Sequence, residues 1–502
     1  MKRFSIIWSI CLMLVLALLA GCGSDSSTAL SANNVNLIFV VTPDLAYNTP
    51  GDIQSDTANL TSQGLNRSLQ MASYLKQQVL GGNNVTGIYT ISPMSHLQTA
   101  NKYPNMAAIG FIQQFALLNQ ITLTTDANGT RYTANSFTIN ASYARAEGVP
   151  TGVANPSSFC TNCSGLDFNN TAGINDTLLA GIINKKNPGF YLFAAPWVTV
   201  RTMLENINSA YGYNLSLPAS YKGTNYVYAI SIPTSGKATF ATYDSNLNPS
   251  ATYPVLPNNV TPTACTNTNP LHQDYFSLSA SSGMTGVTIP ANVNRNSRIY
   301  IVRHAEAHPD APTYGFDNGN FVAAGQWRAL ALANTLSGKI APNAVYSIDP
   351  SGMWYFNRDA AVSYVRPALT VLPYAIANNL PYYLAADLKL GNPYTPTELD
   401  VAQATRDYFF FPHPDGSSFS NHTILVAWES GHIRPFLNEL IKSFGTGLPL
   451  LDTVGPPTGG WLSTDYDTIW TVTLDAQGNL TIHNALCEGI DSLKLPNGPP
   501  MF

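Results

Sequence analysis

Arginine and histidine side chains recur in three short segments of the C-terminal half of the chain. Arg303 and His304 are adjacent, Arg366 begins the segment "RPALT", and His432 lies in "WESGHIRPF". Guanidinium groups are planar and permanently charged, which suits them to phosphate oxygens. A neutral imidazole can attack phosphorus and carry the phosphoryl group, and nearby arginines favour its neutral form. These segments indicate phosphoryl transfer, with His304 as nucleophile and His432 as donor to the equatorial oxygens.

The candidate side chains follow predicted strands. An apolar run at 299–302 directly precedes Arg303, and a second run at 424–428 precedes Glu429 and His432. Such runs alternate with helical patterns, which predicts an α/β fold with a central sheet covered by helices on both faces. Ligands of such sheets bind outside the carboxyl ends of the strands, where these side chains would meet.

The chain contains an internal repeat. Segments 36–48 and 298–310 share one apolar pattern, and segments 60–75 and 321–336 match at the same offset. Later segments of the two halves also correspond, with altered spacing that insertions in loops would produce. The repeat predicts two tandem three-layer αβα modules, of which only the second carries the candidate site.

These patterns divide the chain into five parts. A signal peptide is predicted at 1–22 and a linker at 23–34, followed by the first module at 35–254. A linker rich in proline and asparagine at 255–296 leads to the second module at 297–502.

The first module lacks the candidate groups at the corresponding positions. It has Thr42 for Arg303, Pro43 for His304, Ser95 for Arg366 and Thr199 for His432. Neither a nucleophile nor an arginine pair remains, so we expect this half to be a catalytically inactive copy that serves packing, binding or access to its partner.

The N-terminus predicts export. Lys2 and Arg3 precede an apolar stretch at 10–20, and "LAGC" then ends at Cys22. This resembles a bacterial lipoprotein signal, which implies a lipid on Cys22 and a position in the cell envelope. By the same resemblance, the absence of Asp directly after Cys22 favours the outer membrane, facing the periplasm or the exterior. An uncleaved N-terminal anchor is the alternative.

Composition and cysteine count fit this compartment. The 502 residues are 45% hydrophobic and carry a net charge of −5, which argues against nucleic acid as a partner. Cys160, Cys163, Cys265 and Cys487 remain after Cys11 and Cys22, and in an oxidising compartment they predict the disulfides Cys160–Cys163 and Cys265–Cys487. Half a zinc site or a redox pair is the alternative for "CTNC". We expect no metal and no cofactor, and as partners a small phosphorylated substrate or phosphate and the membrane.

Three motifs together resemble the histidine phosphatase superfamily, also called phosphoglycerate mutase-like. They are "RHAE", "RPALT" and the histidine after the last strand, and the resemblance covers most of 296–445. It implies a phosphorylated nucleophile at His304 and a phosphate pocket made of Arg303, Arg366 and His432. The sequence departs from the family at Ala305, where glycine is usual, and at His432, which lies further from its strand.

The resemblance also implies a general acid in a loop after the second-arginine helix, where Asp387 is the nearest carboxyl. Glu306 and Glu429 are alternatives, and each could equally orient an arginine or a histidine. The sequence thus predicts an envelope-anchored phosphatase that hydrolyses phosphomonoesters through a phosphohistidine and needs no metal. A pseudophosphatase that binds a phosphorylated ligand, suggested by the inactive copy and Ser430, and a structural envelope lipoprotein remain as alternatives.

Overall fold

The computed structural model describes most of the chain after the predicted signal. The described residues are 28–47, 51–124, 131–141, 164–265, 272–307, 318–351, 353–357, 360–386, 398–451, 461–462 and 464–502. Cys22, Cys160, Cys163 and Asp387 lie outside them. Among the residues that are described, no helix combines the length and the apolar character that crossing a bilayer requires.

The N-terminal half contains a six-stranded sheet in the order β10-β9-β1-β8-β2-β7. Its strands are β1 (Val35–Val41), β2 (Gly87–Thr90), β7 (Ile139–Asn140), β8 (Gly189–Ala195), β9 (Tyr226–Ile232) and β10 (Thr239–Asp244). Strand β1 runs parallel to β8, and the parallel pairing continues through β2 to β7. Strands β9 and β10 pair in antiparallel fashion on the other side of β1.

The C-terminal half contains a seven-stranded sheet in the order β11-β19-β18-β12-β17-β13-β16. Its strands are β11 (Ser277–Ala280), β12 (Ser297–Arg303), β13 (Ala344–Ile348), β16 (Tyr382–Ala386), β17 (Thr423–Trp428), β18 (Thr468–Leu474) and β19 (Leu480–Cys487). From β19 to β16 the parallel and antiparallel pairings follow the same sequence as those from β10 to β7. Strand β11 adds an antiparallel edge strand.

Helices cover both faces of each sheet. They are α2 (Ser62–Tyr74), α3 (Ala107–Leu117), α4 (Ile174–Lys185), α5 (Trp197–Tyr211), α6 (Ala323–Thr335), α7 (Arg366–Ala377), α8 (Glu398–Phe410) and α9 (Ser430–Ser443). Successive side chains of a strand point to opposite faces. Accordingly, Ile38 of β1 packs in one core with α2 and α3, whereas Phe39 packs with α4 and α5. In β12, Val302 faces α6 and α7, and Ile301 faces α8 and α9. The predicted α/β fold class is confirmed.

Short elements complete the described structure. Two-stranded sheets are formed by β3 (Leu97–Gln98) with β4 (Tyr103–Pro104), β5 (Gln120–Thr124) with β6 (Arg131–Asn135), and β14 (Met353–Asn357) with β15 (Ala360–Ser363). Single turns are η1 (Leu75–Val79), η2 (Pro93–Ser95), η3 (Thr171–Gly173) and η5 (Ser492–Lys494).

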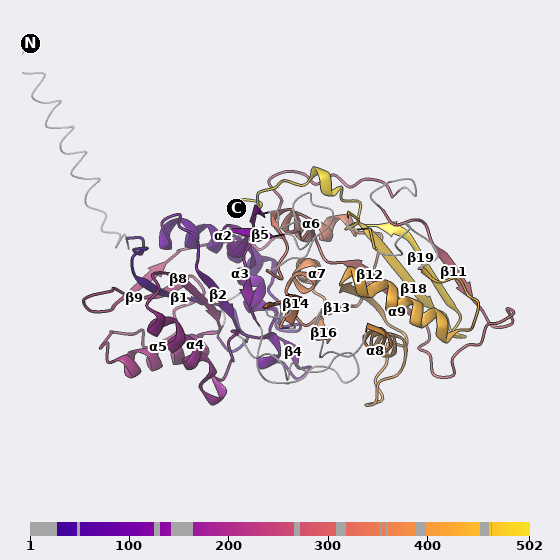
Figure 1. Cartoon of the computed structure of the whole chain (residues 1–502), viewed down its shortest axis with the longest axis horizontal. Coiled ribbons are helices and arrows are strands. Elements are labelled where there is room, and N and C mark those ends of the chain that lie inside the picture. Colours follow the sequence, from indigo (N-terminus) through magenta and orange to yellow (C-terminus); the bar gives the residue numbers. More distant parts are fainter. Residues whose placement is uncertain are drawn as a thin grey trace, which may run out of the picture.

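The two halves share one hydrophobic layer. Helices α2 and α3 of the first half and α6 and α7 of the second belong to the same buried cluster, and they lie together in the middle of the molecule (Figure 1). At Gly110 of α3, an added Cβ would lie 2.7 Å from Leu372 Cδ2 of α7. Helices α3 and α7 therefore approach closely where α3 has a glycine.

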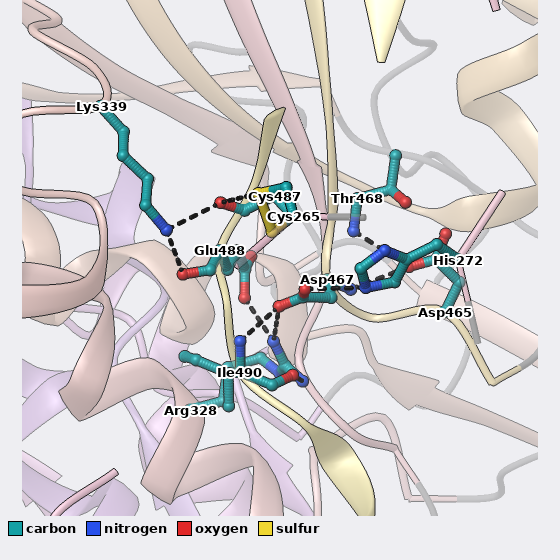
Figure 2. Close-up of a disulfide and its surroundings, with 10 residues drawn as sticks. All are labelled: Cys265, His272, Arg328, Lys339, Asp465, Asp467, Thr468, Cys487, Glu488 and Ile490. Carbon is teal, nitrogen blue, oxygen red and sulfur yellow. Dashed lines mark hydrogen bonds and ion pairs between the residues drawn. A yellow bond between two sulfur atoms is a disulfide. The ribbon is translucent and has the colours of Figure 1, made fainter. Parts of the chain in front are cut away.

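A disulfide and a buried charge cluster brace the second half (Figure 2). Cys265 and Cys487 are bonded, as the sequence predicts. The next residue, Glu488, accepts a 2.6 Å hydrogen bond from Arg328 of α6, whose side chain is fully buried. Arg328 also contacts Glu306 at 2.7 Å and Asp467 at 3.3 Å. One guanidinium therefore faces three carboxyl groups.

This excess of carboxyl groups predicts how stability depends on pH. Burial raises the pKa of Glu488 from 4.5 to about 8, although Arg328 opposes the shift. The folded protein therefore keeps a proton that the unfolded chain releases, and Glu488 lowers the free energy of unfolding as pH rises through this window. Glu488→Gln should gain stability relative to the wild type between about pH 5 and pH 8 in thermal denaturation. If the difference in melting temperature between the wild type and Glu488→Gln stayed constant with pH, the raised pKa of Glu488 would be contradicted.

Candidate active site

The candidate site begins where β12 and β17 end together. Arg303 is paired with Trp428 in the parallel ladder, and the His304 N–H donates to the Trp428 carbonyl at 3.1 Å. The carboxyl ends of parallel strands lie at one edge of a sheet. The register therefore brings the residues after β12 next to Glu429, which follows β17 directly.

His304 is buried with its tautomer defined by a backbone contact. Its Nδ1 atom lies 2.8 Å from the carbonyl oxygen of Ala305, an oxygen that can only accept a hydrogen bond. Nδ1 therefore carries the proton, and the Nε2 lone pair is available. Burial lowers the pKa of His304 well below its usual value, and the positive charges of Arg366 and Arg303 lower it further. The imidazole is thus held in the neutral form that a nucleophile needs.

The two arginine side chains each stack on a tyrosine ring. The Arg303 Cζ atom lies 4.0 Å from the ring centroid of Tyr466, and the Arg366 Cζ atom lies 4.7 Å from that of Tyr364. Both arginines are buried, and such stacking stabilises a cation away from water. Arg303 Nη1 also donates to the Asp465 carbonyl at 3.1 Å. These contacts therefore hold each guanidinium group in a defined position.

The same two rings flank the histidine. The ring centroid of His304 lies 6.2 Å from that of Tyr364 and 6.1 Å from that of Tyr466. Burial raises the pKa of both phenols, so they are neutral at physiological pH. Sequence analysis did not identify these tyrosines. The position of Tyr364 two residues before Arg366 was the available signal, and Tyr466 had none.

His432 lies in the first turn of α9 and is oriented by Glu429. The Glu429 carboxylate caps this helix, accepting from the His432 N–H at 3.1 Å and from its Nδ1 at 2.8 Å. Burial raises the pKa of Glu429, but hydrogen bonds from His432 and Ser430 outweigh burial and lower the pKa to about 2. These contacts show Glu429 orienting His432, and the identity of the general acid stays a prediction.

Glu306 also has an orienting role, but its partner lies outside the pocket. Its Oε1 atom accepts from Arg328 at 2.8 Å and from the Ser492 hydroxyl at 2.8 Å. The motif residue Thr370 is nearer to the histidine, since its Oγ1 accepts from the Ala305 N–H at 2.8 Å and donates to the Arg366 carbonyl at 2.7 Å. Thr370 therefore connects the segment that carries His304 to the start of α7.

The corresponding edge of the first sheet has different chemistry. Asp44, which is buried after β1, contacts His96 Nε2 at 2.6 Å, and the His96 ring stacks on Phe168. Thr199 is buried and donates to the Phe168 carbonyl at 2.8 Å. A carboxylate thus occupies the edge where the second half has its arginines. Among the described residues, no three His, Cys, Asp or Glu side chains are grouped to hold a metal ion.

Comparison with known proteins gives similarities to part of the chain only. No protein-family model and no curated protein matches it. A functionally characterised open reading frame of Mycobacterium tuberculosis aligns at 14% identity, covering 39% of this chain and 100% of its own, with a TM-score of 0.23. The protein histidine phosphatase SixA complexed with tungstate aligns at 17% identity, over 38% and 97%, with a TM-score of 0.20. A mycobacterial glucosyl-3-phosphoglycerate phosphatase with inorganic phosphate aligns at 13% identity, over 35% and 89%, with a TM-score of 0.21.

The charge of Arg366 should be detectable on His304. Because Arg366 lowers the pKa of His304, Arg366→Met should raise it. The pKa can be followed by NMR of protein labelled on its histidine rings, with His304→Gln used to assign the signal. An unchanged pKa in Arg366→Met would show that the two side chains do not interact.

Proposed function

We propose that the protein is a metal-independent phosphomonoesterase of the histidine phosphatase superfamily. One observation carries the proposal: the Ala305 carbonyl holds the proton of His304 on Nδ1, which leaves Nε2 free to attack, and Arg303 and Arg366 both act on its pKa. A buried neutral nucleophile between two cations is suited to a dianionic phosphate.

The reaction proposed has two steps. His304 Nε2 attacks phosphorus, the bond from phosphorus to the ester oxygen breaks, and the leaving alcohol takes a proton from a general acid. Water then gives a proton to the conjugate base of that acid and attacks the phosphohistidine, the phosphorus–nitrogen bond breaks, and inorganic phosphate leaves. Arg303, Arg366 and His432 stabilise the charge that develops on the equatorial oxygens. Asp387 remains the proposed acid from the sequence.

Trapping the intermediate tests the mechanism directly. A chain lacking residues 1–22 should hydrolyse p-nitrophenyl phosphate in the presence of a chelator, and His304→Ala should abolish turnover. Rapid quenching in base should capture an acid-labile, base-stable phosphoryl group on the peptide that contains His304. Wild-type turnover by His304→Gln would mean that another group does the chemistry.

Variants of the two halves provide matched controls for this assay. Arg303→Ala or Arg366→Ala should cost about 2–4 kcal/mol of transition-state stabilisation, measured as kcat/KM. Thr42→Ala and Thr199→Ala, at the first-half positions that correspond to Arg303 and His432, should leave turnover nearly intact. Equal losses in both halves would refute the assignment to the second half.

A pseudophosphatase is the second candidate, and the position of His432 favours it. This residue lies within α9, after Glu429 and Ser430, and not at the end of β17 itself. Tight binding of phosphate without turnover would support this candidate. An absence of both binding and turnover would leave the role of a structural envelope protein.

We also propose that the chain is a tandem duplication. The shared order of strands supports this, and so do two buried arginines. Arg67 in α2 and Arg328 in α6 occupy the same position of helices of equal length, and each contacts a buried carboxylate. Gly64 and Gly325 precede them by the same spacing. The phosphate pocket, in this proposal, was kept by the second copy alone.

Lipid attachment at Cys22 is the proposed means of anchoring, on the basis of the "LAGC" sequence. The mature protein should then be recovered with the envelope membranes of a bacterial host, and Cys22→Ser should release it or leave it unprocessed. Mass spectrometry of the N-terminal peptide provides the measurement. If the N-terminal peptide recovered from the membrane fraction had the same mass in the wild type and in Cys22→Ser, apart from the substitution itself, the modification would be ruled out.

A further inference from the structure

A short segment of the second half lies between the first half and the candidate active site. Residues 318–321 precede α6, and the side chains of Asn318, Asn320 and Phe321 are almost fully buried. The segment makes hydrogen bonds both to the start of α7 and to residues of the first half. It therefore connects the first half of the chain to Arg366, although the two are far apart in the sequence.

On one side the segment positions Arg366. The carbonyl oxygen of Gly319 accepts from the N–H groups of Val365 and Arg366, both at 3.1 Å. The carbonyl oxygen of Asn320 accepts from Arg366 Nη1 at 3.4 Å. Gly319 has φ +67°, and a Cβ there would lie 1.9 Å from the Ser363 carbonyl oxygen, so only glycine fits. The start of α7 and its guanidinium both rest on this backbone.

On the other side, residues of the first half hold the segment. Gln113 Nε2 in α3 donates to Asn320 Oδ1 at 3.0 Å, and Asn320 Nδ2 donates to the Phe137 carbonyl at 3.0 Å. The Ser136 hydroxyl accepts from Asn318 Nδ2 at 2.6 Å and donates to the Phe321 carbonyl at 2.9 Å. Buried hydrogen bonds are directional, and a buried polar group left without its partner is costly. The first half thereby restricts where the segment can lie.

We propose that Gln113 and Ser136 of the first half are positioning residues for the phosphate-binding Arg366 of the second half. They act through the backbone of residues 318–321. The inactive copy is in this way part of the active site's support, and the pocket depends on both halves. That Arg366 binds phosphate rests on the proposed function. That Arg366 lies near His304 does not, because it comes from the structure itself.

Gln114 supplies a matched control in the same helix. It is buried like Gln113, and its Nε2 donates to the Pro500 carbonyl of the second half at 2.6 Å. Gln113→Leu and Gln114→Leu therefore each remove one buried hydrogen bond between the halves, but only the first acts on the segment beneath Arg366. Any general loss of stability at the interface should appear in both variants.

The experiment uses the full-length chain in detergent and reads the position of Arg366 in two ways. Gln113→Leu should raise the pKa of His304 toward its value in Arg366→Met and should weaken inorganic phosphate binding about five- to tenfold by calorimetry. Gln114→Leu should change neither. In an Arg366→Met background, Gln113→Leu should have no further effect, because the two substitutions act through one guanidinium.

Each other outcome is decisive. Equal changes in the two glutamine variants, an unaltered His304 pKa in Gln113→Leu, or an additive effect in the Arg366→Met background would overturn the proposal. If Gln113→Leu does not fold, Gln113→Asn shortens the side chain while keeping it polar and should give the same direction of change. A protein that shows the pKa changes but no turnover would refute the phosphatase and leave the positioning role standing.

Discussion

The repulsion between positive charges is the constraint on which the rest of the candidate site depends. Arg303 and Arg366 are buried beside His304, and in a medium of low polarity like charges are costly to bring together. The faces of Tyr466 and Tyr364 and several backbone carbonyl oxygens stabilise the two guanidinium groups. The neutral state of His304 follows from its burial first and from the charges of Arg366 and Arg303 second, because a third cation would be costly there.

Sequence reasoning located the part of this site that depends on local pattern. Arg303 and His304 follow an apolar strand, and strand ends of a parallel sheet share an edge, so the approach of His304 to Glu429 could be predicted. The role of Tyr466 could not, because a tyrosine near a strand has the same pattern whether it packs in a core or supports a guanidinium. Asn320 is a similar case, since its partner Gln113 lies 207 residues away and periodicity carries no information on such a contact.

The orienting glutamates show the same limit. The sequence predicted that Glu306 could orient an arginine, and it does contact one, but that arginine is Arg328 of the charge cluster. Choosing among arginines requires the packing of α6 against the end of β12. Glu429 was predictable as a partner of a histidine because it lies three residues before His432, a spacing that brings a helix cap and the first turn together.

The shared hydrophobic layer also has a consequence for how the chain folds. Helix α3 ends at Leu117 and its partner α7 begins at Arg366, roughly 250 residues later, although both belong to one buried cluster. Closing a loop of this length is costly in chain entropy and slow. Until both halves are in place, apolar side chains of α3 and α7 remain uncovered, and exposed apolar surface of this kind favours aggregation during folding.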